Sequence, residues 1–249
     1  MTQNTDPAFL PADWPAPSNI RAVVTTRCGG TSEGDWDSFN LAQHVSDDAQ
    51  HVNANRQRLS RILNLPAEPL WLNQVHGVQV VDAAQAEQNI TADGSYATTV
   101  NTVCCVMTAD CLPVLLTDDE GSFIAALHAG WRGLLDGVIE AAVDQYPADK
   151  VSLMAWLGPA IGPAAFEVGD EVRDAFCQLD PPAAQAFVAG RDGKWLADLY
   201  ALARMRLQKK GVTRIYGGDF CTFSQPEQFY SFRRDGQTGR MASLIWRVS

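Results

Sequence analysis

Short apolar runs separated by Gly, Pro and polar residues constrain the fold of this chain more than any other feature. Such runs are typical of buried strands. Between them lie longer segments whose apolar residues recur at helical spacing, which indicates helices packed on a core. The sequence predicts strands at 20–26, 71–81, 102–108, 112–117, 123–127, 151–157 and 214–217. It predicts helices at about 48–63, 134–143, 169–179 and 195–208, and a closing hairpin of 229–234 with 241–248.

The order of these segments favours one compact unit. The chain contains no long linker, no internal repeat and no low-complexity segment. We therefore expect a single α+β domain over residues 1–249, with layered mixed β-sheets flanked by helices. The Pro-rich residues 1–18 are expected to form an irregular lead-in.

The charge balance excludes some partners. Nineteen Lys and Arg residues against 29 Asp and Glu give a formal net charge of -10, which repels polyphosphates and anionic lipid surfaces. We expect no nucleic-acid and no membrane partner. The first residues resemble no export signal, so we expect a cytoplasmic protein whose six cysteines are free thiols or metal ligands.

Two histidines and one cysteine form the strongest candidate site. His76 and His128 each stand near a glycine at the end of a predicted strand, and Cys111 precedes another strand. Their separations are too long for one helix but suit three loops that meet at one edge of a sheet. Two imidazoles and a thiolate suit zinc, with water as the fourth ligand in a catalytic site. A fourth protein ligand would make a structural site. We assign His44 and His51, near a predicted helix start, to solvent.

The same residues allow other chemistry. Cys111 and His128 could form the thiolate and imidazole pair of a cysteine-type hydrolase, in which His76 has no necessary place. Met107 would complete a blue-copper set. A multicopper oxidase needs a further histidine cluster, and the chain has only four histidines. Copper therefore fits less well than zinc.

Two kinds of feature suit an anion. Residues 128–133 (HAGWRG) open a predicted helix, so their free backbone N–H groups could hold a negative charge. Arg27 precedes a Gly-Gly loop, and Arg233 closes a predicted strand. An arginine side chain can bind a phosphate or carboxylate through two parallel hydrogen bonds.

Several sequence blocks, in order along nearly the whole chain, resemble the YfiH family, long labelled polyphenol oxidase or laccase-domain proteins. The blocks are 38–41 (SFNL), 73–77 (NQVHG), 107–114 (MTADCLPV), 127–133 (LHAGWRG), 156–163 (WLGPAIGP) and 231–235 (SFRRD). The resemblance implies a single-domain α+β fold related to the catalytic domain of cytotoxic necrotising factor. It also implies a zinc site formed by His76, Cys111 and His128, the residues selected above.

The resemblance further implies a purine nucleoside enzyme with nucleoside and phosphate as its small-molecule partners. The implied reactions are phosphorolysis of adenosine, inosine, guanosine and methylthioadenosine, and deamination of adenosine. We expect Cys111, His128 and Asp110 to be catalytic, with Asp110 or Glu167 as proton donor.

Arg27, Asn40 and Arg233 are expected to bind substrate or phosphate. Two alternatives stay open. Some bacterial members are linked to editing of peptidoglycan precursors, which would suit a cysteine-type hydrolase. A zinc-stabilised binding module is the third possibility.

Overall fold

A six-stranded mixed sheet forms the centre of the protein. The computed structural model describes residues 8–248. The strand order of this sheet is β12-β8-β6-β7-β4-β3, antiparallel in the middle and parallel at both edges. Its strands are β3 (Val80–Asp82), β4 (Gly94–Ala97), β6 (Leu112–Asp118), β7 (Ile124–Ala129), β8 (Leu153–Leu157) and β12 (Arg214–Gly217).

A four-stranded antiparallel sheet packs against one face of the central sheet. Its order is β1-β2-β13-β5, with β1 (Phe9–Pro11), β2 (Ile20–Thr25), β5 (Val103–Thr108) and β13 (Met241–Arg247). Val106 and Ile245 of this sheet share one buried apolar cluster with Leu115 and Ile124 of the central sheet. The two sheets therefore form a sandwich with a common core.

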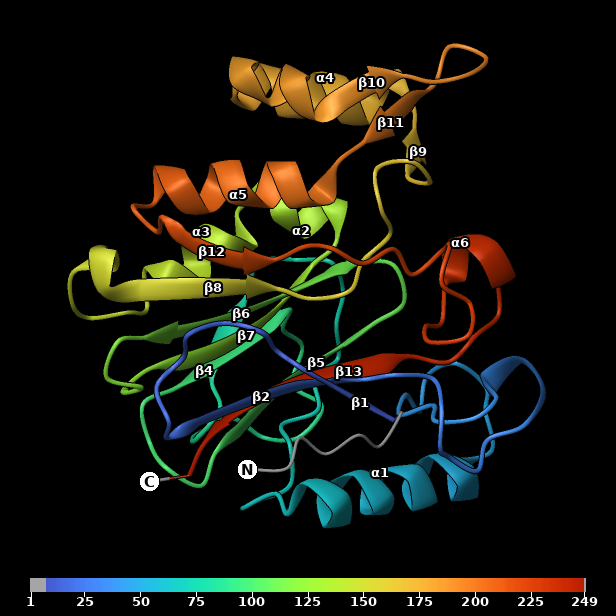
Figure 1. The fold of residues 1–249 in the computed structure, drawn as a ribbon, viewed down its shortest axis with the longest axis vertical. Helices are drawn as coiled ribbons and strands as arrows, with labels where there is room; N and C mark the ends of the chain where they lie inside the picture. The colour runs from blue at the N-terminus through green and yellow to red at the C-terminus, as the bar shows by residue number, and fades with distance from the viewer. Residues whose placement is uncertain (1–7, 249) are drawn as a thin grey trace.

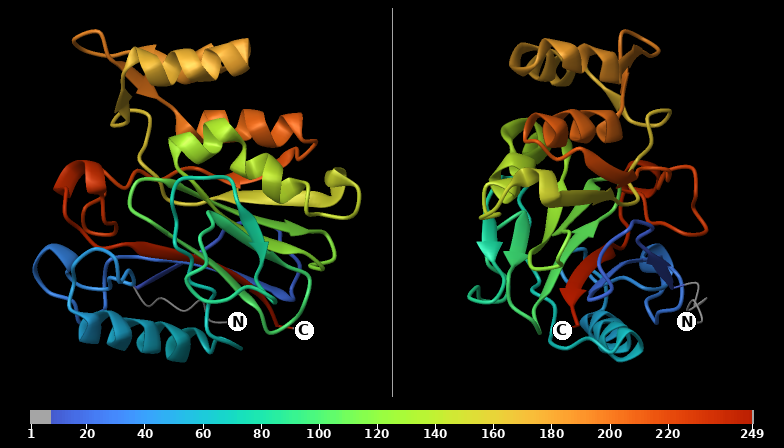
Figure 2. Two further views of the ribbon diagram at one scale, coloured as in Figure 1. Left: turned by 180° about the vertical axis from the view of Figure 1, so that it is seen from behind. Right: turned by 60° about the vertical axis from the view of Figure 1, so that its left-hand side comes forward.

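Helices cover the outer faces of the sandwich (Figures 1 and 2). On the four-stranded sheet lies α1 (Ala49–Leu63), where Leu59 packs with Val103 and Leu244. The other side of the central sheet is covered by α2 (Trp131–Asp136), α3 (Val138–Val143) and α5 (Leu199–Lys209). These layers confirm the expected α+β class.

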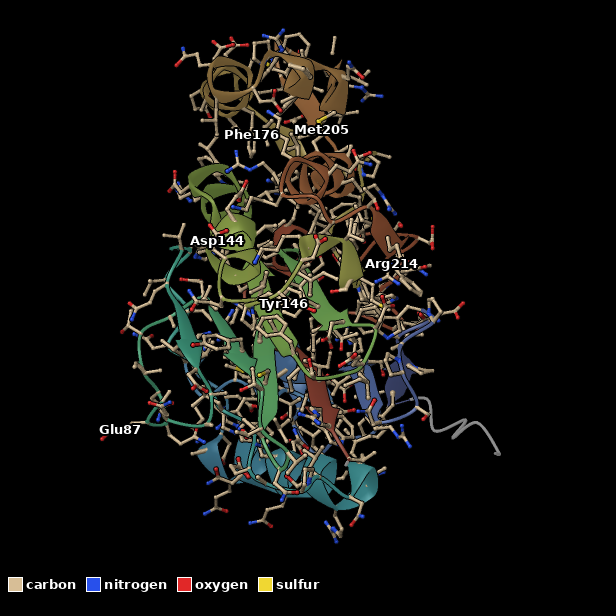
Figure 3. All side chains as sticks on the ribbon, turned by 90° about the vertical axis from the view of Figure 1, so that its left-hand side faces the viewer. Glu87, Asp144, Tyr146, Phe176, Met205 and Arg214 are labelled. Atoms are coloured by element: carbon tan, nitrogen blue, oxygen red, sulfur yellow. The ribbon has the colours of Figure 1, made fainter. Side chains whose placement is uncertain are left out.

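An outermost layer sits on α5. It contains α4 (Asp170–Leu179) and the three-stranded sheet β10-β11-β9, formed by β9 (Glu167–Val168), β10 (Phe187–Ala189) and β11 (Trp195–Ala197). Figure 3 shows Phe176 of α4 and Met205 of α5 between the two layers. Phe176 belongs to the core cluster of the central sheet, and Met205 packs against that cluster. Short helical segments complete the fold: the 3-10 turns Gly34–Trp36, Lys150–Ser152 and Pro181–Ala186, and α6 (Phe232–Asp235).

Local sequence signals are confirmed for many elements. The predicted strands at 20–26, 102–108, 112–117, 123–127 and 214–217 correspond to β2, β5, β6, β7 and β12, and two predicted helices to α1 and α4. The Asp48 side chain accepts a hydrogen bond from the Gln50 N–H and caps α1. The strand predicted at 151–157 begins at Leu153, after a 3-10 turn.

Two predicted helices have different boundaries. Residues 134–143 do not form one helix, because Gly137 has a φ of 107° and separates α2 from α3. Glycine adopts this left-handed conformation without steric cost. The segment 195–208 begins as strand β11, and the Asp198 side chain then caps α5 by accepting from the Ala201 N–H.

Two predicted strand segments are wrong. Of residues 71–81, only Val80 and Val81 join a named strand, because the preceding N–H groups bond to the Asp93 carboxylate instead of a neighbouring strand. The closing hairpin is absent, since residues 232–235 form α6 and β13 pairs with β2 and β5. The expected lead-in falls partly on residues 1–7, outside the described residues, and its remainder contains β1. Among the residues described, no helix has the length and hydrophobicity that crossing a bilayer requires.

Candidate metal and substrate site

The structure brings His76, Cys111 and His128 together. His76 lies in the loop before β3, Cys111 immediately precedes β6, and His128 lies near the end of β7. The distance from Cys111 Sγ to His76 Nε2 is 3.7 Å, and the ligand atoms of all three residues lie within 4.8 Å of one another. In residues 8–248, this is the one group of three or more His, Cys, Asp or Glu side chains so arranged.

Asp93 organises this group from behind. Its fully buried carboxylate accepts hydrogen bonds from His128 Nδ1 (2.8 Å) and from the backbone N–H groups of Val75 (3.2 Å), His76 (2.8 Å) and Gly77 (2.6 Å). Burial alone would raise the pKa of Asp93, but the hydrogen bonds from His128 and Gly77 outweigh it and lower the pKa. Because Nδ1 of His128 is engaged, its Nε2 is the atom left to bind a metal.

Two glycines of the 128–133 turn allow the close packing of the group. A Cβ atom on Gly130 would lie 2.8 Å from Cδ2 of His76 and 3.0 Å from Sγ of Cys111, and a Cβ on Gly133 would lie 2.7 Å from the Gly77 carbonyl oxygen. Both distances to carbon and oxygen are too short for real contacts. The absence of side chains at Gly130 and Gly133 therefore lets His76 and its loop pack closely against this turn.

The Gly130→Ala substitution is expected to push the His76 ring away from Cys111. The backbone at Gly130, with φ -61° and ψ 159°, is open to alanine, so the chain should fold and the damage should stay local. We expect metal affinity to fall by at least about tenfold, as for changes that misorient a ligand. Competition with a zinc chelator measures it. Wild-type affinity in a folded variant would contradict this reading of the turn.

Charge couples Cys111 to His128. Burial would raise the pKa of the Cys111 thiol, but His128 and then His76 stabilise the thiolate and lower the pKa to about 6. Burial would lower the pKa of His128, but the Cys111 charge and the Asp93 hydrogen bond raise it to about 9. The charged forms of Cys111 and His128 therefore stabilise each other. A thiol with a lowered pKa and a histidine oriented by Asp93 suit a divalent metal ion such as zinc.

A pocket of about 230 Å³ opens onto the three side chains. Its other lining residues include His44, Gln74, Thr108, Phe232 and Arg240. The Gln74 amide bonds to both the N–H and the carbonyl of Met107, which fixes the His76 loop to β5. His44 is exposed, as expected, but it also lines this pocket. His51 is half-buried on α1 and is not among the lining residues.

Asp110 and Glu167, the expected proton donors, are not among the lining residues of this pocket. The Asp110 carboxylate accepts from Thr222 Oγ1 and from the Arg233 N–H, both at 2.6 Å. It thereby joins the Cys111 loop to α6. Glu167 is exposed, and its backbone carbonyl accepts a hydrogen bond from Arg233 Nη1.

The three expected anion-binding residues also lie outside the pocket lining. Arg27 donates to the carbonyls of Asp37 and Pro226 and lines a separate hollow. Arg233 donates to a carbonyl on β9. Asn40 is fully buried, and its Oδ1 accepts from the Arg240 N–H. The pocket therefore gathers the three predicted metal ligands but none of the predicted phosphate ligands.

Sequence reasoning missed Asp93 and Arg240. Asp93 sits among small residues with no motif around it, and Arg240 follows a polar turn just before β13. Only the general expectation that a metal-bound histidine has a carboxylate partner could have prompted a search for Asp93.

The fold and site define an α+β protein with a two-histidine, one-cysteine metal-capable centre. The family model described as "Multi-copper polyphenol oxidoreductase laccase" matches residues 21–248, and the chain belongs to this family. Relatives of this chain that carry the name YfiH confirm the resemblance to the YfiH family. In the described part of the chain, the ligand group found suits one metal ion rather than several coppers.

Relatives with curated names and solved structures match over nearly the full chain. "Purine nucleoside phosphorylase PA4543" of Pseudomonas aeruginosa is 52% identical over 240 residues, covering 96% of this chain and 98% of the relative. "Purine nucleoside phosphorylase YfiH" of Escherichia coli is 51% identical, covering 94% and 97%. The crystal structure of Neisseria meningitidis protein NMB0706 has a TM-score of 0.94 at 50% identity, covering 97% and 100%. The crystal structure of YlmD from Geobacillus stearothermophilus has a TM-score of 0.92 at 30% sequence identity, and the match covers 100% of this chain and 98% of YlmD.

Proposed function

We propose that this protein is a zinc-dependent purine nucleoside enzyme. The proposed reactions are phosphorolysis of adenosine, inosine, guanosine and methylthioadenosine, and hydrolytic deamination of adenosine. The observation that carries the proposal is the convergence of His76, Cys111 and His128 at a pocket. The names of relatives at 52% and 51% identity support the purine nucleoside as substrate.

The donor set supports zinc. Two imidazole nitrogens and one thiolate are common zinc ligands, and three protein ligands beside a pocket leave room for a fourth, non-protein ligand. Zinc, when bound, would supply Lewis-acid chemistry at the pocket. Asp93 fixes the ring of His128, and its bonds to the backbone of residues 75–77 fix the loop that carries His76.

The pocket residues have separate tasks in this proposal. Phe232 is 58% exposed at the pocket, and its ring offers an apolar face on which a purine can stack. Gln74 holds the His76 loop against β5. We propose Asp110 as a positioning residue, because its carboxylate ties the Cys111 loop to α6 through Thr222 and Arg233.

A nucleoside panel tests this function. The zinc-loaded protein is incubated with each nucleoside, with and without phosphate, and the products are identified by chromatography. Inosine with phosphate should give hypoxanthine and ribose 1-phosphate, and adenosine with water should give inosine and ammonia. The first reaction should require phosphate and the second should not. If no member of the panel is converted by the zinc-loaded protein, the proposed function is wrong.

The close approach of Cys111 to His128, whose charged forms stabilise each other, favours a cysteine-type hydrolase of peptidoglycan precursors as a second candidate. A thiolate nucleophile would work without a metal, and His76 would be dispensable. Hydrolysis of a precursor that persists after chelation and in His76→Ala would support it. Loss of all activity on chelation, with recovery on adding zinc, would exclude it.

A further inference from the structure

A second hollow adjoins the metal pocket. This groove, of about 440 Å³, is lined by Val45, Ser46, Gln237 and Thr238. It shares His44, Phe232 and Arg240 with the metal pocket. These three side chains therefore border both spaces, and a ligand that contacts them can reach from one into the other.

Arg240 forms no direct ion pair with an Asp or Glu side chain of the described residues. Its Nη1 donates to the carbonyls of Thr238 (2.8 Å) and Gly239 (2.9 Å), whereas Nε and Nη2 make no hydrogen bond within residues 8–248. The side chain is half-buried, and no Asp or Glu of those residues forms an ion pair with it. The charged forms of Cys111 and Asp110 compensate only in part for the removal of this guanidinium from water. A directly bound anion would offset more of that cost.

The backbone that carries Arg240 is fixed. Its N–H donates to Asn40 Oδ1 at 3.0 Å, and the Asn40 amide nitrogen donates in turn to the Ala42 carbonyl and to Asp47. A Cβ atom on Gly239 would lie 2.6 Å from the Tyr230 ring and 2.9 Å from Asn40 Cβ. The backbone at Gly239 is therefore packed tightly between the side chains of Tyr230 and Asn40. Asn40, expected from the sequence to bind substrate, acts here on Arg240.

Each of the two hollows that Arg240 borders also contains a buried threonine whose hydroxyl group has no partner among the described residues. Thr108 lines the metal pocket and Thr238 lines the groove, and each is 1% exposed. The Oγ1 atom of each makes no hydrogen bond within the described residues. Unpaired buried polar atoms are rare in folded proteins and are often satisfied by a ligand or water. Both hollows therefore retain hydrogen-bonding capacity for a ligand rich in oxygen.

We infer that Arg240 anchors a binding subsite for a phosphoryl group between the metal pocket and the groove. The free Nε and Nη2 atoms suit a paired hydrogen bond to two oxygens of a tetrahedral anion. The inference deepens the proposed function, on which it rests for the identity of the anion as inorganic phosphate, the co-substrate of phosphorolysis. The phosphate of a nucleoside monophosphate has the same chemistry. Arg27 and Arg233 are less suited, because neither residue lines the metal pocket or the groove.

Titration of the zinc-loaded protein with inorganic phosphate tests the subsite directly. Calorimetry compares wild type with Arg240→Gln, Arg240→Lys and Arg27→Lys. The matched control is Arg191→Gln, because Arg191 is exposed in the turn between β10 and β11. Since a charge-assisted pair is lost, we expect phosphate to bind about 10- to 100-fold more weakly to Arg240→Gln. Arg240→Lys should recover only part of this, because lysine lacks the planar pair of donors.

The kinetic readout separates the subsite from general damage. In Arg240→Gln the KM for phosphate should rise by the same factor, while zinc content and the KM for inosine stay within about twofold of wild type. Unchanged phosphate affinity in Arg240→Gln, or an equal loss in Arg191→Gln, would overturn the inference. An equal loss in Arg27→Lys alone would move the subsite to the Arg27 hollow and also overturn it.

A parallel titration with inosine 5′-monophosphate identifies the source of the phosphoryl group. Arg240-dependent binding of inorganic phosphate supports the co-substrate assignment, and Arg240-dependent binding of the nucleotide alone supports the subsite with a nucleotide as its ligand. Failure of the proposed function is distinguishable. Arg240-dependent phosphate binding without nucleoside conversion would refute the function and keep the subsite. Phosphorolysis with an unchanged KM for phosphate in Arg240→Gln would support the proposed function and refute the subsite.

Discussion

The His128→Ala variant is expected to lose the metal and, with it, both phosphorolysis and deamination. The substitution removes one of three protein ligands, and it also leaves Cys111 without the neighbour that favours its thiolate. Because metal-based charge stabilisation is worth several kcal/mol, activity should fall on the order of a thousandfold or more. Elemental analysis should show zinc falling from about one ion per chain in wild type to near zero.

Two further variants sharpen this result. His51→Ala serves as a control, because His51 lies on α1 and not in the pocket lining, so it should keep zinc and activity. His76→Ala should behave like His128→Ala if the three residues act as one metal centre. Nucleoside conversion that survives in a zinc-free His128→Ala protein would remove the metal from the proposed mechanism.

The Asp93→Ala variant is expected to destabilise the protein itself as well as the site. The substitution leaves three backbone N–H groups in residues 75–77 and the His128 Nδ1 without their acceptor. Loss of a fully buried charged acceptor of this kind costs about 3–5 kcal/mol. Urea denaturation of the metal-free proteins measures the change in the free energy of unfolding.

Asp93→Asn separates charge from hydrogen bonding. The amide oxygen keeps part of the acceptor role but lacks the charge that orients His128, so we expect a smaller loss of stability and metal affinity about 10- to 100-fold below wild type. A free energy of unfolding in Asp93→Ala within about 1 kcal/mol of wild type would show that the loop of residues 75–77 is held by other contacts.

The elements that sequence analysis predicted well are those fixed by local signals. Strands β5, β6 and β7 are continuous apolar runs because both of their faces are buried in the sandwich. Helix α1 has its cap at Asp48. The metal-capable group was found because His76, Cys111 and His128 are scarce residue types placed at strand ends. These features can be recognised without knowing the tertiary fold.

The features that were missed depend on distant partners. Residues 71–79 look like a strand, but the Asp93 carboxylate accepts the N–H groups of residues 75–77. Residues 229–234 look like half of a hairpin, but the Arg233 N–H bonds to Asp110 instead. Arg27 was selected because it stands beside a Gly-Gly loop, whereas only the fold shows that Arg240 borders the pocket and that Arg27 does not.

The position of β13 determines the order in which this protein can be completed during synthesis. It follows every other strand in the chain, yet it lies inside its sheet between β2 and β5. A chain that leaves the ribosome from its N-terminus therefore carries two strands with unpaired edges until residues 241–247 emerge. Arg240 emerges with them. A nascent chain stalled before that point lacks the anion partner proposed for the pocket and exposes β2 and β5 to pairing with other nascent chains.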